Sequence, residues 1–549
     1  MEIILGFFLA LFLSILMVPV LMKYAARWKL VDAPDPRKSH AGLIPRVGGI
    51  GIALSAAIPA LLWAQHNLAL WGYLAGALLI VLSGILDDRF NLDFRTKFLS
   101  QAAAAIIVSA SDICIYHLPL FGFDPIPVWV GHGLTVVFLL AVTNAFNLLD
   151  GLDGLAAGCA ILTLSAMGLL ASGVGGVDVV LIAVAVIGGV LGFLRYNTHP
   201  AQVFMGDAGS QFLGFTIGVL SILLIEHTQN AWSPAIVLPI LGLPIFDTAM
   251  VMALRIKQGR SPFSPDRNHI HHKLLTLGFK HHQAVAVIYA IQALMIASAW
   301  LLRFESDALV LGVYVAICLG WVVAYLALKR LRHPGHGLAD MMPHAEPVLD
   351  GRWRLWKRRI RGVAVRYVEW SVAGYLIIGA GAARSVPADI SALALGLGAA
   401  TILLPLLSLQ LATPVIRVSA YLSAIYISYL GATSEDFGWL NAFELNIWLT
   451  SLAAALATIV ILSPREQFQF SPLDLLVVLV LIAALMIPIP FIDQTILSRI
   501  LVRSLVMLYA CELLLAQRRS RFGPVGLAAT LSLLALGGHL LVSYWNFPD

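Results

Sequence analysis

Long apolar stretches separated by polar segments recur along the chain, and their lengths predict membrane-spanning helices. Each covers roughly 17–23 residues, enough for a helix to cross a hydrocarbon layer about 30 Å thick. Eleven are expected near residues 3–22, 47–64, 69–86, 98–112, 131–148, 157–172, 177–194, 211–226, 234–254, 284–302 and 307–328. About six or seven more follow between residues 368 and 545. The pattern therefore predicts an all-α, polytopic transmembrane helix bundle with about eleven spans in its first part.

The first apolar stretch could be mistaken for a secretion signal. It has no basic start, since Glu2 is its only early charge, and no small-residue cleavage site follows it. We therefore expect it to be a retained first span.

Lysine and arginine predict the side of the membrane that each polar segment faces. Basic residues follow the first, third, seventh, ninth and eleventh stretches, whereas the intervening segments contain only Arg303. Positively charged loops usually stay in the cytoplasm. The alternation therefore places the N-terminus outside and the basic loops in the cytoplasm.

Composition supports a membrane protein and excludes other classes. Hydrophobic residues make up 60% of the chain and charged residues only 12%, about half of the charged share that a soluble domain carries. The net charge of +5 is explained by the cytoplasmic loops, and no basic groove interleaved with aromatic residues indicates a nucleic-acid partner. The four cysteines form no CxxC pair, so neither a disulfide nor a thiolate metal site is expected.

Three regions are expected from the change in polarity along the chain. Residues 1–330 form a membrane-embedded domain, residues 331–367 a basic cytoplasmic linker, and residues 368–549 an additional transmembrane domain of unknown role. The linker contains the run Arg-Trp-Arg-Leu-Trp-Lys-Arg-Arg, which is typical either of a solvated connector or of an interfacial helix near anionic lipid.

Polar side chains of unusual density lie in the loops assigned to the cytoplasm. Asp87 and Asp88 come where the third span ends, and ionisable residues at such a position are functional candidates; the alternative is a solvated helix end neutralised by Arg89. Asp207 opens the eighth span, where it could cap the helix or hold a cation that the helix end bridges to a phosphate.

A second cluster ends the fifth span. Asn144, Asn147, Asp150 and Asp153 follow one another at three-residue steps, a spacing that would place them on one face of a helical turn. Gly151 and Gly154 would allow a ligand to approach closely. Hard oxygen ligands of this kind suit Mg²⁺, whereas the alternative is a polar loop of helix caps.

A third cluster follows the ninth span. His269, His271 and His272 lie within four positions, but no cysteine or glutamate completes a familiar zinc spacing. Beside Arg267 they would form a donor array for a pyrophosphate. Asp247, inside the ninth span, could face the same cavity. The Pro- and Gly-rich segment 32–49 is basic at headgroup level, so it would meet a lipid phosphate or anchor the span.

Taken in this order, the motifs resemble those of the polyprenyl-phosphate N-acetylhexosamine-1-phosphate transferase family, over about residues 1–330. The family includes undecaprenyl-phosphate GlcNAc-1-phosphate transferases and phospho-MurNAc-pentapeptide transferases; the His-Ile-His-His sequence looks like the GlcNAc type. The resemblance implies an eleven-span bundle in the bacterial inner membrane, with a cytoplasmic active site. It implies transfer of a sugar 1-phosphate from a UDP-N-acetylhexosamine to a polyprenyl phosphate with release of UMP, the initiating step of a cell-envelope glycan.

The resemblance also implies roles for individual residues. The Mg²⁺ ligands, for which Mn²⁺ could substitute, would be Asn147 and Asp207. Asp87 and Asp88 match the pair near the attacking lipid phosphate, and Asp150 and Asp153 count with them as catalytic candidates. The substrate-binding residues would be Gly151, Leu152 and Asp153 for uridine, and Arg267, His269, His271 and His272 for the diphosphate and sugar. No role follows for Arg46, and a homodimer is open.

Three alternatives stay open at this point. A double displacement through an aspartyl–phosphosugar intermediate competes with direct in-line transfer. A phospho-MurNAc-pentapeptide transferase competes within the family. A transporter or flippase competes outside it, although transporters place their charged sites near the membrane midplane, whereas these clusters lie in loops on one side.

Overall fold

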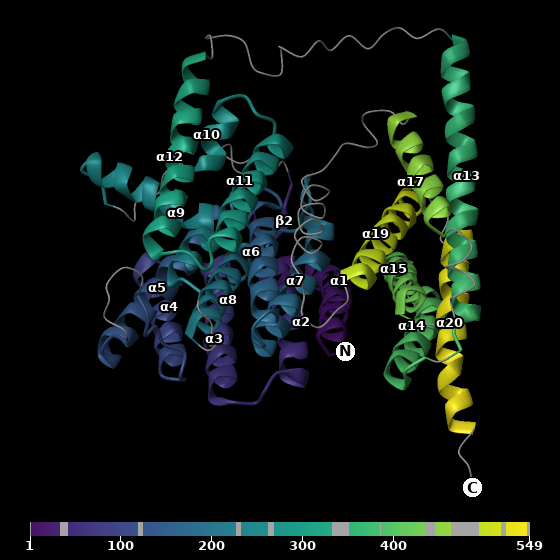
Figure 1. The fold of residues 1–549 in the computed structure, drawn as a ribbon, viewed down its shortest axis with the longest axis horizontal. Coiled ribbons are helices and arrows are strands. Elements are labelled where there is room, and N and C mark those ends of the chain that lie inside the picture. The colour runs from purple at the N-terminus through teal and green to yellow at the C-terminus, as the bar shows by residue number, and fades with distance from the viewer. Residues whose placement is uncertain are drawn as a thin grey trace. The chain divides into compact units, whose positions relative to one another are not determined.

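The computed structural model describes eleven stretches of the chain: residues 2–32, 42–118, 125–226, 232–261, 268–331, 351–384, 386–407, 409–433, 445–462, 494–517 and 523–545. The chain divides into two units, with residues 1–344 and 470–488 in the first and residues 345–469 and 489–549 in the second. The units are described separately (Figure 1).

The first unit contains every helix expected from the eleven apolar stretches. They are α1 (Glu2–Trp28), α2 (Gly48–Trp63), α3 (Leu68–Phe90), α4 (Phe94–Ser109), α5 (Val128–Leu149), α6 (Leu155–Ser172), α7 (Val177–Asn197), α8 (Gly206–Glu226), α9 (Val237–Lys257), α11 (His281–Leu301) and α12 (Asp307–Leu331). The remaining elements are the short helix α10 (Ile270–Thr276), the 3-10 turn η1 (Pro234–Ile236), and the strands β1 (Val31–Asp32) and β2 (Ile44–Pro45).

The prediction of an all-α, multi-pass membrane protein is confirmed. Among the described residues, 11 helices are long and apolar enough to cross a membrane. Helices α2 and α4 have only 16 residues each, which is short for a span of their own. Several helices extend beyond their apolar stretch, and α3 continues through Asp87 and Asp88 to Phe90.

Helix α8 is the centre of the first unit. In its apolar window 89% of the residues are buried, against 17% in α12. Close helix packing in lipid depends on small residues, and in this unit glycines allow the close approach. A β-carbon at Gly49 of α2 would lie 2.7 Å from the carbonyl oxygen of Met205, and one at Gly84 of α3 would lie 2.9 Å from the carbonyl carbon of Asp207. Both helices therefore reach the start of α8 in direct contact.

Backbone hydrogen bonds join the two-stranded sheet to this helix start. The strands are antiparallel, with Val31 opposite Pro45 and Asp32 opposite Ile44. The N–H groups of Gly48 and Gly49 donate to the carbonyls of Phe204 and Met205 at 3.0 and 2.9 Å. β2 and α10 lie at the same end of the bundle, at the top of Figure 1.

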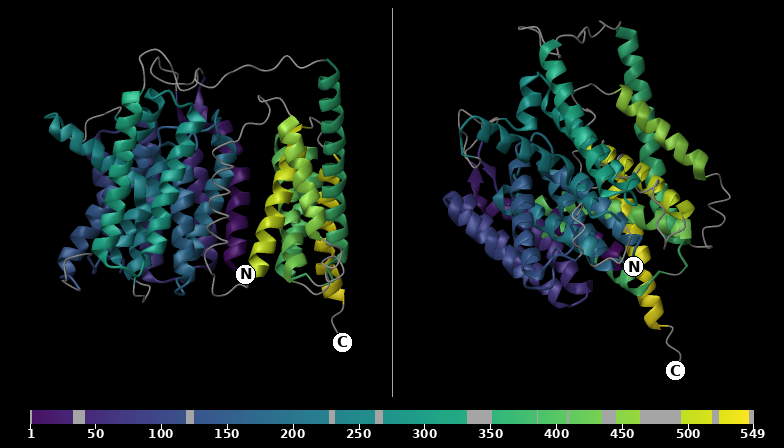
Figure 2. Two further views of the ribbon diagram at one scale, coloured as in Figure 1. Left: turned by 45° about the horizontal axis from the view of Figure 1, so that its top comes forward. Right: turned by 60° about the vertical axis from the view of Figure 1, so that its left-hand side comes forward.

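The second unit is also helical. Its described helices are α13 (Gly351–Ala382), α14 (Ala388–Leu407), α15 (Leu409–Thr433), α17 (Leu445–Leu462), α19 (Gln494–Gln517) and α20 (Pro524–Trp545), seen from two further directions in Figure 2. Residues 351–367, expected in the linker, form the first turns of the 32-residue helix α13. Polar contacts join its helices: Arg503 donates to the carbonyl of Gly431 at 3.0 Å, and Tyr421 donates to Glu512.

Candidate functional site

Asp207 lies in the first turn of α8 and is the most accessible acid of a polar cluster. Asn147 Nδ2 donates to Asp207 Oδ1 at 3.0 Å and to Ser210 Oγ at 2.9 Å. Lys97 Nζ donates to Asp207 Oδ2 at 3.1 Å. The Asp207 side chain is 32% exposed, so its carboxylate faces open space while its partners hold its orientation.

Asp87 and Asp88, in the last turn of α3, join this cluster through different contacts. Asp88 accepts the backbone N–H groups of Asp207 and Ala208 at 3.1 and 3.3 Å, so it caps the N-terminus of α8 in the way that satisfies free helix donors. Gly206 permits this contact because its φ is +69° and a β-carbon there would lie 2.9 Å from Asp88 Cγ. Asp87 accepts the N–H of Leu92 at 2.8 Å and pairs with Lys97.

Lys97 links two of the predicted acids and was missed as a site residue. Its ammonium contacts both Asp87 and Asp207. The link depends on a tight turn: Asn91 ends α3 in the left-handed conformation at φ 52°, and Asp93 begins α4 by accepting the N–H of Thr96. The first turn of α4 therefore folds back onto α3. Sequence shows Lys97 only as one of many basic loop residues.

The predicted Asn/Asp cluster does not share one helical face. Helix α5 ends at Leu149, and Asp150 is its C-terminal cap. The expectation of one helical turn through Asp153 is therefore wrong, since α6 begins only at Leu155. Burial raises the pKa of Asp150 to about 7, with the charge of Asp207 acting in the same direction and that of Arg46 opposing it. Asp150 is thus part of the same electrostatic cluster.

Arg46 provides the positive charge on the other side of the cluster. It pairs with Asp32 of β1 and lies 3.7 Å from Asp88. Its side chain is 33% exposed, so the guanidinium lies at the rim of the acidic cluster. Residues 33–41 of the predicted headgroup loop lie outside the described residues.

The histidines after α9 are anchored by Asp247. His269 Nδ1 donates to Asp247 Oδ2 at 2.8 Å, and the N–H of Ile270 donates to its Oδ1 at 2.9 Å. His269 and Asp247 are both buried, so the acid fixes the start of α10. Arg267, predicted to act beside these histidines, lies outside the described residues.

His271 brings this loop against the α5–α6 connection. Its ring packs so closely on Gly151 that a β-carbon there would lie 2.6 Å from His271 Cε1. Burial lowers the pKa of His271 to about 3, and the neighbouring His272 and His269 act in the same direction. His271 is therefore neutral before a ligand binds, and in this form it offers a phosphate a hydrogen-bond donor rather than a positive charge. His272 lies beside it, with ring centroids 4.2 Å apart.

Asp153 belongs to a separate group of side chains. His199 Nδ1 lies 2.6 Å from Asp153 Oδ2, which also accepts the N–H of Ala201 at 3.1 Å. The backbone N–H of Asp153 donates to His281 Nε2 at 3.1 Å. The predicted residue is therefore in place, but its two histidine partners were not predicted.

The donor chemistry of the Asp207 cluster fits a hard divalent cation. Asp207 and Asn147 present carboxylate and amide oxygens, and Asp87 contacts the same Lys97 ammonium as Asp207. Mg²⁺ prefers such oxygens and completes its shell with water and phosphate. The Asn147 amide nitrogen faces Asp207 and Ser210, which leaves its oxygen as a ligand.

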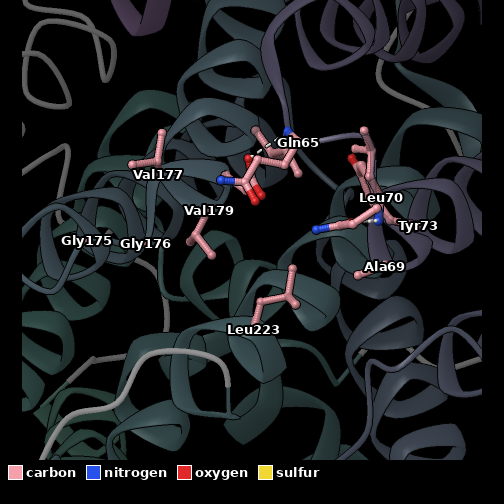
Figure 3. Close-up of a pocket in the computed structure, with 12 residues that line it drawn as sticks. Gln65, Ala69, Leu70, Tyr73, Gly175, Gly176, Val177, Val179 and Leu223 are labelled. Carbon is pink, nitrogen blue, oxygen red and sulfur yellow. Dashed lines mark hydrogen bonds between the residues drawn. The ribbon is translucent and has the colours of Figure 1, made fainter.

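A pocket of about 260 Å³ lies at the opposite end of the bundle, where α3 and α7 begin and α8 ends. Figure 3 shows Gln65, Tyr73 and Leu223 around it. The N–H of Gln65 donates to Asp178 Oδ1 at 3.1 Å. None of the predicted site residues lines this pocket, so among the described residues it is separate from the candidate site.

Comparisons with known proteins show which proteins the chain is similar to. Residues 70–225 match the family model described as glycosyl transferase family 4. The chain is 36% identical over 305 residues to the probable undecaprenyl-phosphate N-acetylglucosaminyl 1-phosphate transferase of Bacillus subtilis, covering 55% of this chain and 85% of the relative. It is 36% identical over 285 residues to the undecaprenyl-phosphate alpha-N-acetylglucosaminyl 1-phosphate transferase of Yersinia pestis, covering 50% and 78%. It is 33% identical over 342 residues to the decaprenyl-phosphate N-acetylglucosaminephosphotransferase of Mycolicibacterium smegmatis, covering 56% and 84%.

Proposed function

Because the chain belongs to the polyprenyl-phosphate N-acetylhexosamine-1-phosphate transferase family, we propose that it transfers N-acetylglucosamine 1-phosphate from UDP-N-acetylglucosamine to a polyprenyl phosphate and releases UMP. The observation that carries the proposal is the cluster of Asp207, Asn147, Asp87 and Lys97 at one end of the helix bundle. A transporter is disfavoured because this cluster lies at the helix ends rather than at the midplane.

Asp207 and Asn147 would hold the divalent cation, Mg²⁺ or Mn²⁺. When bound, the cation would neutralise the diphosphate and stabilise the charge on the departing UMP. Asp88 acts indirectly: by capping α8 it fixes the position of Asp207. Asn147 has the same effect through its amide group, so the carboxylate is oriented before substrate arrives.

The uridine and sugar would bind beside this cluster. Gly151, Leu152 and Asp153 form the connection against which His271 packs, so the two segments proposed for the nucleotide sugar are in contact. Since His271 is neutral, the positive charge for the diphosphate must come from other residues. Lys97 and Arg46 both lie within the cluster.

Direct transfer is favoured over an aspartyl intermediate. Both oxygens of Asp88 accept backbone N–H groups, and the two oxygens of Asp87 contact Leu92 and Lys97. Attack by either carboxylate would therefore have to give up one of these contacts. The lipid phosphate has a second pKa of about 6, so at neutral pH it is mostly ionised and needs little help from a base.

The cell-envelope role and the cytoplasmic orientation follow from the same proposal. Lys97 and Arg46, from two of the basic segments, lie at the end of the bundle that carries Asp207, and positive loops usually face the cytoplasm. UDP-sugars would then reach the site from the cytoplasm, while the polyprenyl phosphate would enter from the inner membrane.

The test is UMP release by the purified full-length chain from UDP-N-acetylglucosamine, with polyprenyl phosphate and Mg²⁺. We expect Asp207→Asn and Asn147→Ala each to lower turnover by about 100-fold or more, since even outer-shell changes cost 10- to 100-fold. Asp178→Asn is the matched control: Asp178 is also a first-turn acid, in α7, but lies at the opposite end beside Gln65. Full turnover in both site variants would refute the assignment of the cation ligands.

A further inference from the structure

Three potential metal ligands converge outside the Asp207 cluster. Asp153 comes from the α5–α6 connection, His199 from the loop after α7, and His281 from the first turn of α11. One ligand atom from each lies within 4.8 Å of the other two. The His199 and His281 rings are stacked, with centroids 4.1 Å apart and planes at 17°. This convergence joins positions up to 128 residues apart in the chain.

We propose that Asp153, His199 and His281 form a second metal site, which binds a transition-metal dication such as Zn²⁺ or Co²⁺. Two imidazoles and one carboxylate are the ligand set that favours these metals, whereas Mg²⁺ prefers oxygen ligands alone. Three protein ligands would leave further coordination positions for water or another molecule. The chain would thus hold two cation sites of different chemistry.

The hydrogen bond that His281 accepts shows which ring nitrogen would bind a metal. Its Nε2 accepts the backbone N–H of Asp153, so its proton resides on Nδ1. That Nδ1 is buried and has no hydrogen-bond partner among the described residues. A metal bound to Nε2 would replace the hydrogen bond from the Asp153 N–H, and the ring proton would stay on Nδ1.

His199 is accessible to a metal ion from solvent. Its Nδ1 faces Asp153 Oδ2 at 2.6 Å, and its side chain is 51% exposed. Metal binding to histidine requires the neutral ring and releases protons.

The second site would regulate the nucleotide site, a consequence that rests on the proposed function. Asp153 lies in the stretch proposed for uridine, and a bound metal would engage its carboxylate. We expect Zn²⁺ to raise the KM for the UDP-sugar while Mg²⁺ is saturating. The inhibition should disappear in the His199→Gln variant if the variant retains turnover.

The direct test is binding of Co²⁺ and Zn²⁺ to the full-length, EDTA-treated chain in detergent, by Co²⁺ absorption and by calorimetry. With saturating Mg²⁺ present to fill the Asp207 cluster, we expect one equivalent to bind, and His199→Gln and His281→Gln each to weaken binding by at least about 10-fold. His282→Gln, next in the chain, and His272→Gln, in the other histidine cluster, are the controls and should bind as the wild type does. The exposed His199 is the decisive position, because its replacement is not expected to disturb folding.

Three results would overturn the proposal: no binding by the wild type, undiminished binding by His199→Gln, or loss of binding in His272→Gln. The Asp207→Asn variant separates this proposal from the proposed function. It is expected to lose turnover but to keep Co²⁺ binding, so a failure of the transferase assignment leaves the metal test intact.

Discussion

A methyl group at Gly151 would separate the two segments proposed to hold the nucleotide sugar. The β-carbon of Gly151→Ala would lie 2.6 Å from His271 Cε1 and closer still to Nε2. Ordinary van der Waals contact begins near 3.4 Å, so the ring would have to recede by about 1 Å. The backbone of Gly151 has no positive φ, so the substitution acts through this contact rather than through backbone strain.

The ring has little room to recede. His271 is 2% exposed, its ring is parallel to that of His269 at 5.8 Å, and His269 is fixed by Asp247. The displacement would therefore pass to the whole start of α10. A misplacement of about 1 Å costs about 100-fold in rate, and overpacking costs about 1–3 kcal/mol of stability.

The measurement is kcat and KM for UMP release, together with the thermal unfolding temperature. Gly133→Ala is the matched control, because Gly133 lies in α5 and a β-carbon there meets nothing within 4 Å. The double variant Gly151→Ala/His271→Ala tests the cause. If the clash is responsible, the double variant is no slower than His271→Ala alone, since the interaction is then removed. Near-normal turnover in Gly151→Ala, or an additive loss in the double variant, would refute the reasoning.

Two further predictions concern the charges of the cluster. Lys97→Met would leave the carboxylates of Asp87 and Asp207 without their shared ammonium, which lowers stability by about 1–3 kcal/mol at this partial exposure. Added Mg²⁺ should then raise the unfolding temperature of the variant more than that of the wild type. An equal rise in both proteins would indicate that Mg²⁺ does not bind where the Lys97 ammonium lies. Because the pKa of Asp150 is raised to about 7, its carboxylate is protonated as pH falls through 7. If the ionised form is required, kcat/KM should fall about tenfold per pH unit below 7. Asp150→Asn, which resembles the protonated acid, should then be slow at every pH and should lack that limb; an unchanged limb in the variant would assign it to another group.

The helices could be predicted from sequence because each depends on a local property. A long apolar run fixes both the helix and its burial in lipid, where every backbone group must be bonded within the segment. Boundaries were less predictable, since α3 continues through Asp87 and Asp88 beyond its apolar stretch. Polar residues in the last turn of a helix can stay helical when another element provides their hydrogen-bond partners, as α8 does for Asp88.

Several residues of the site could be predicted from the sequence, but most contacts between them could not. Asp207 and Asn147 are 60 positions apart and meet as expected, because the fifth stretch ends and the eighth begins on the same side. Lys97, by contrast, is indistinguishable in sequence from other loop cations. His199 and His281 have no motif around them, and their partner Asp153 is 46 and 128 positions away. Such contacts depend on how helices pack, which a single sequence does not specify.

The start of α8 explains why these acids can be clustered at all. Several carboxylates in a poorly solvated place repel one another and need compensation. The free N–H groups and the positive dipole of a helix N-terminus provide part of it, and Asp88 takes two of those donors. Lys97 and Arg46 provide the rest from α4 and from the segment after β2. The close approach of α2 and α3 at Gly49 and Gly84 brings these charges within reach of one helix end. The charged site therefore assembles only if the small residues let the helices pack closely. A larger residue at Gly84 should move α3 away from α8 and so disturb the contacts of Asp88 as much as a substitution of Asp88 does.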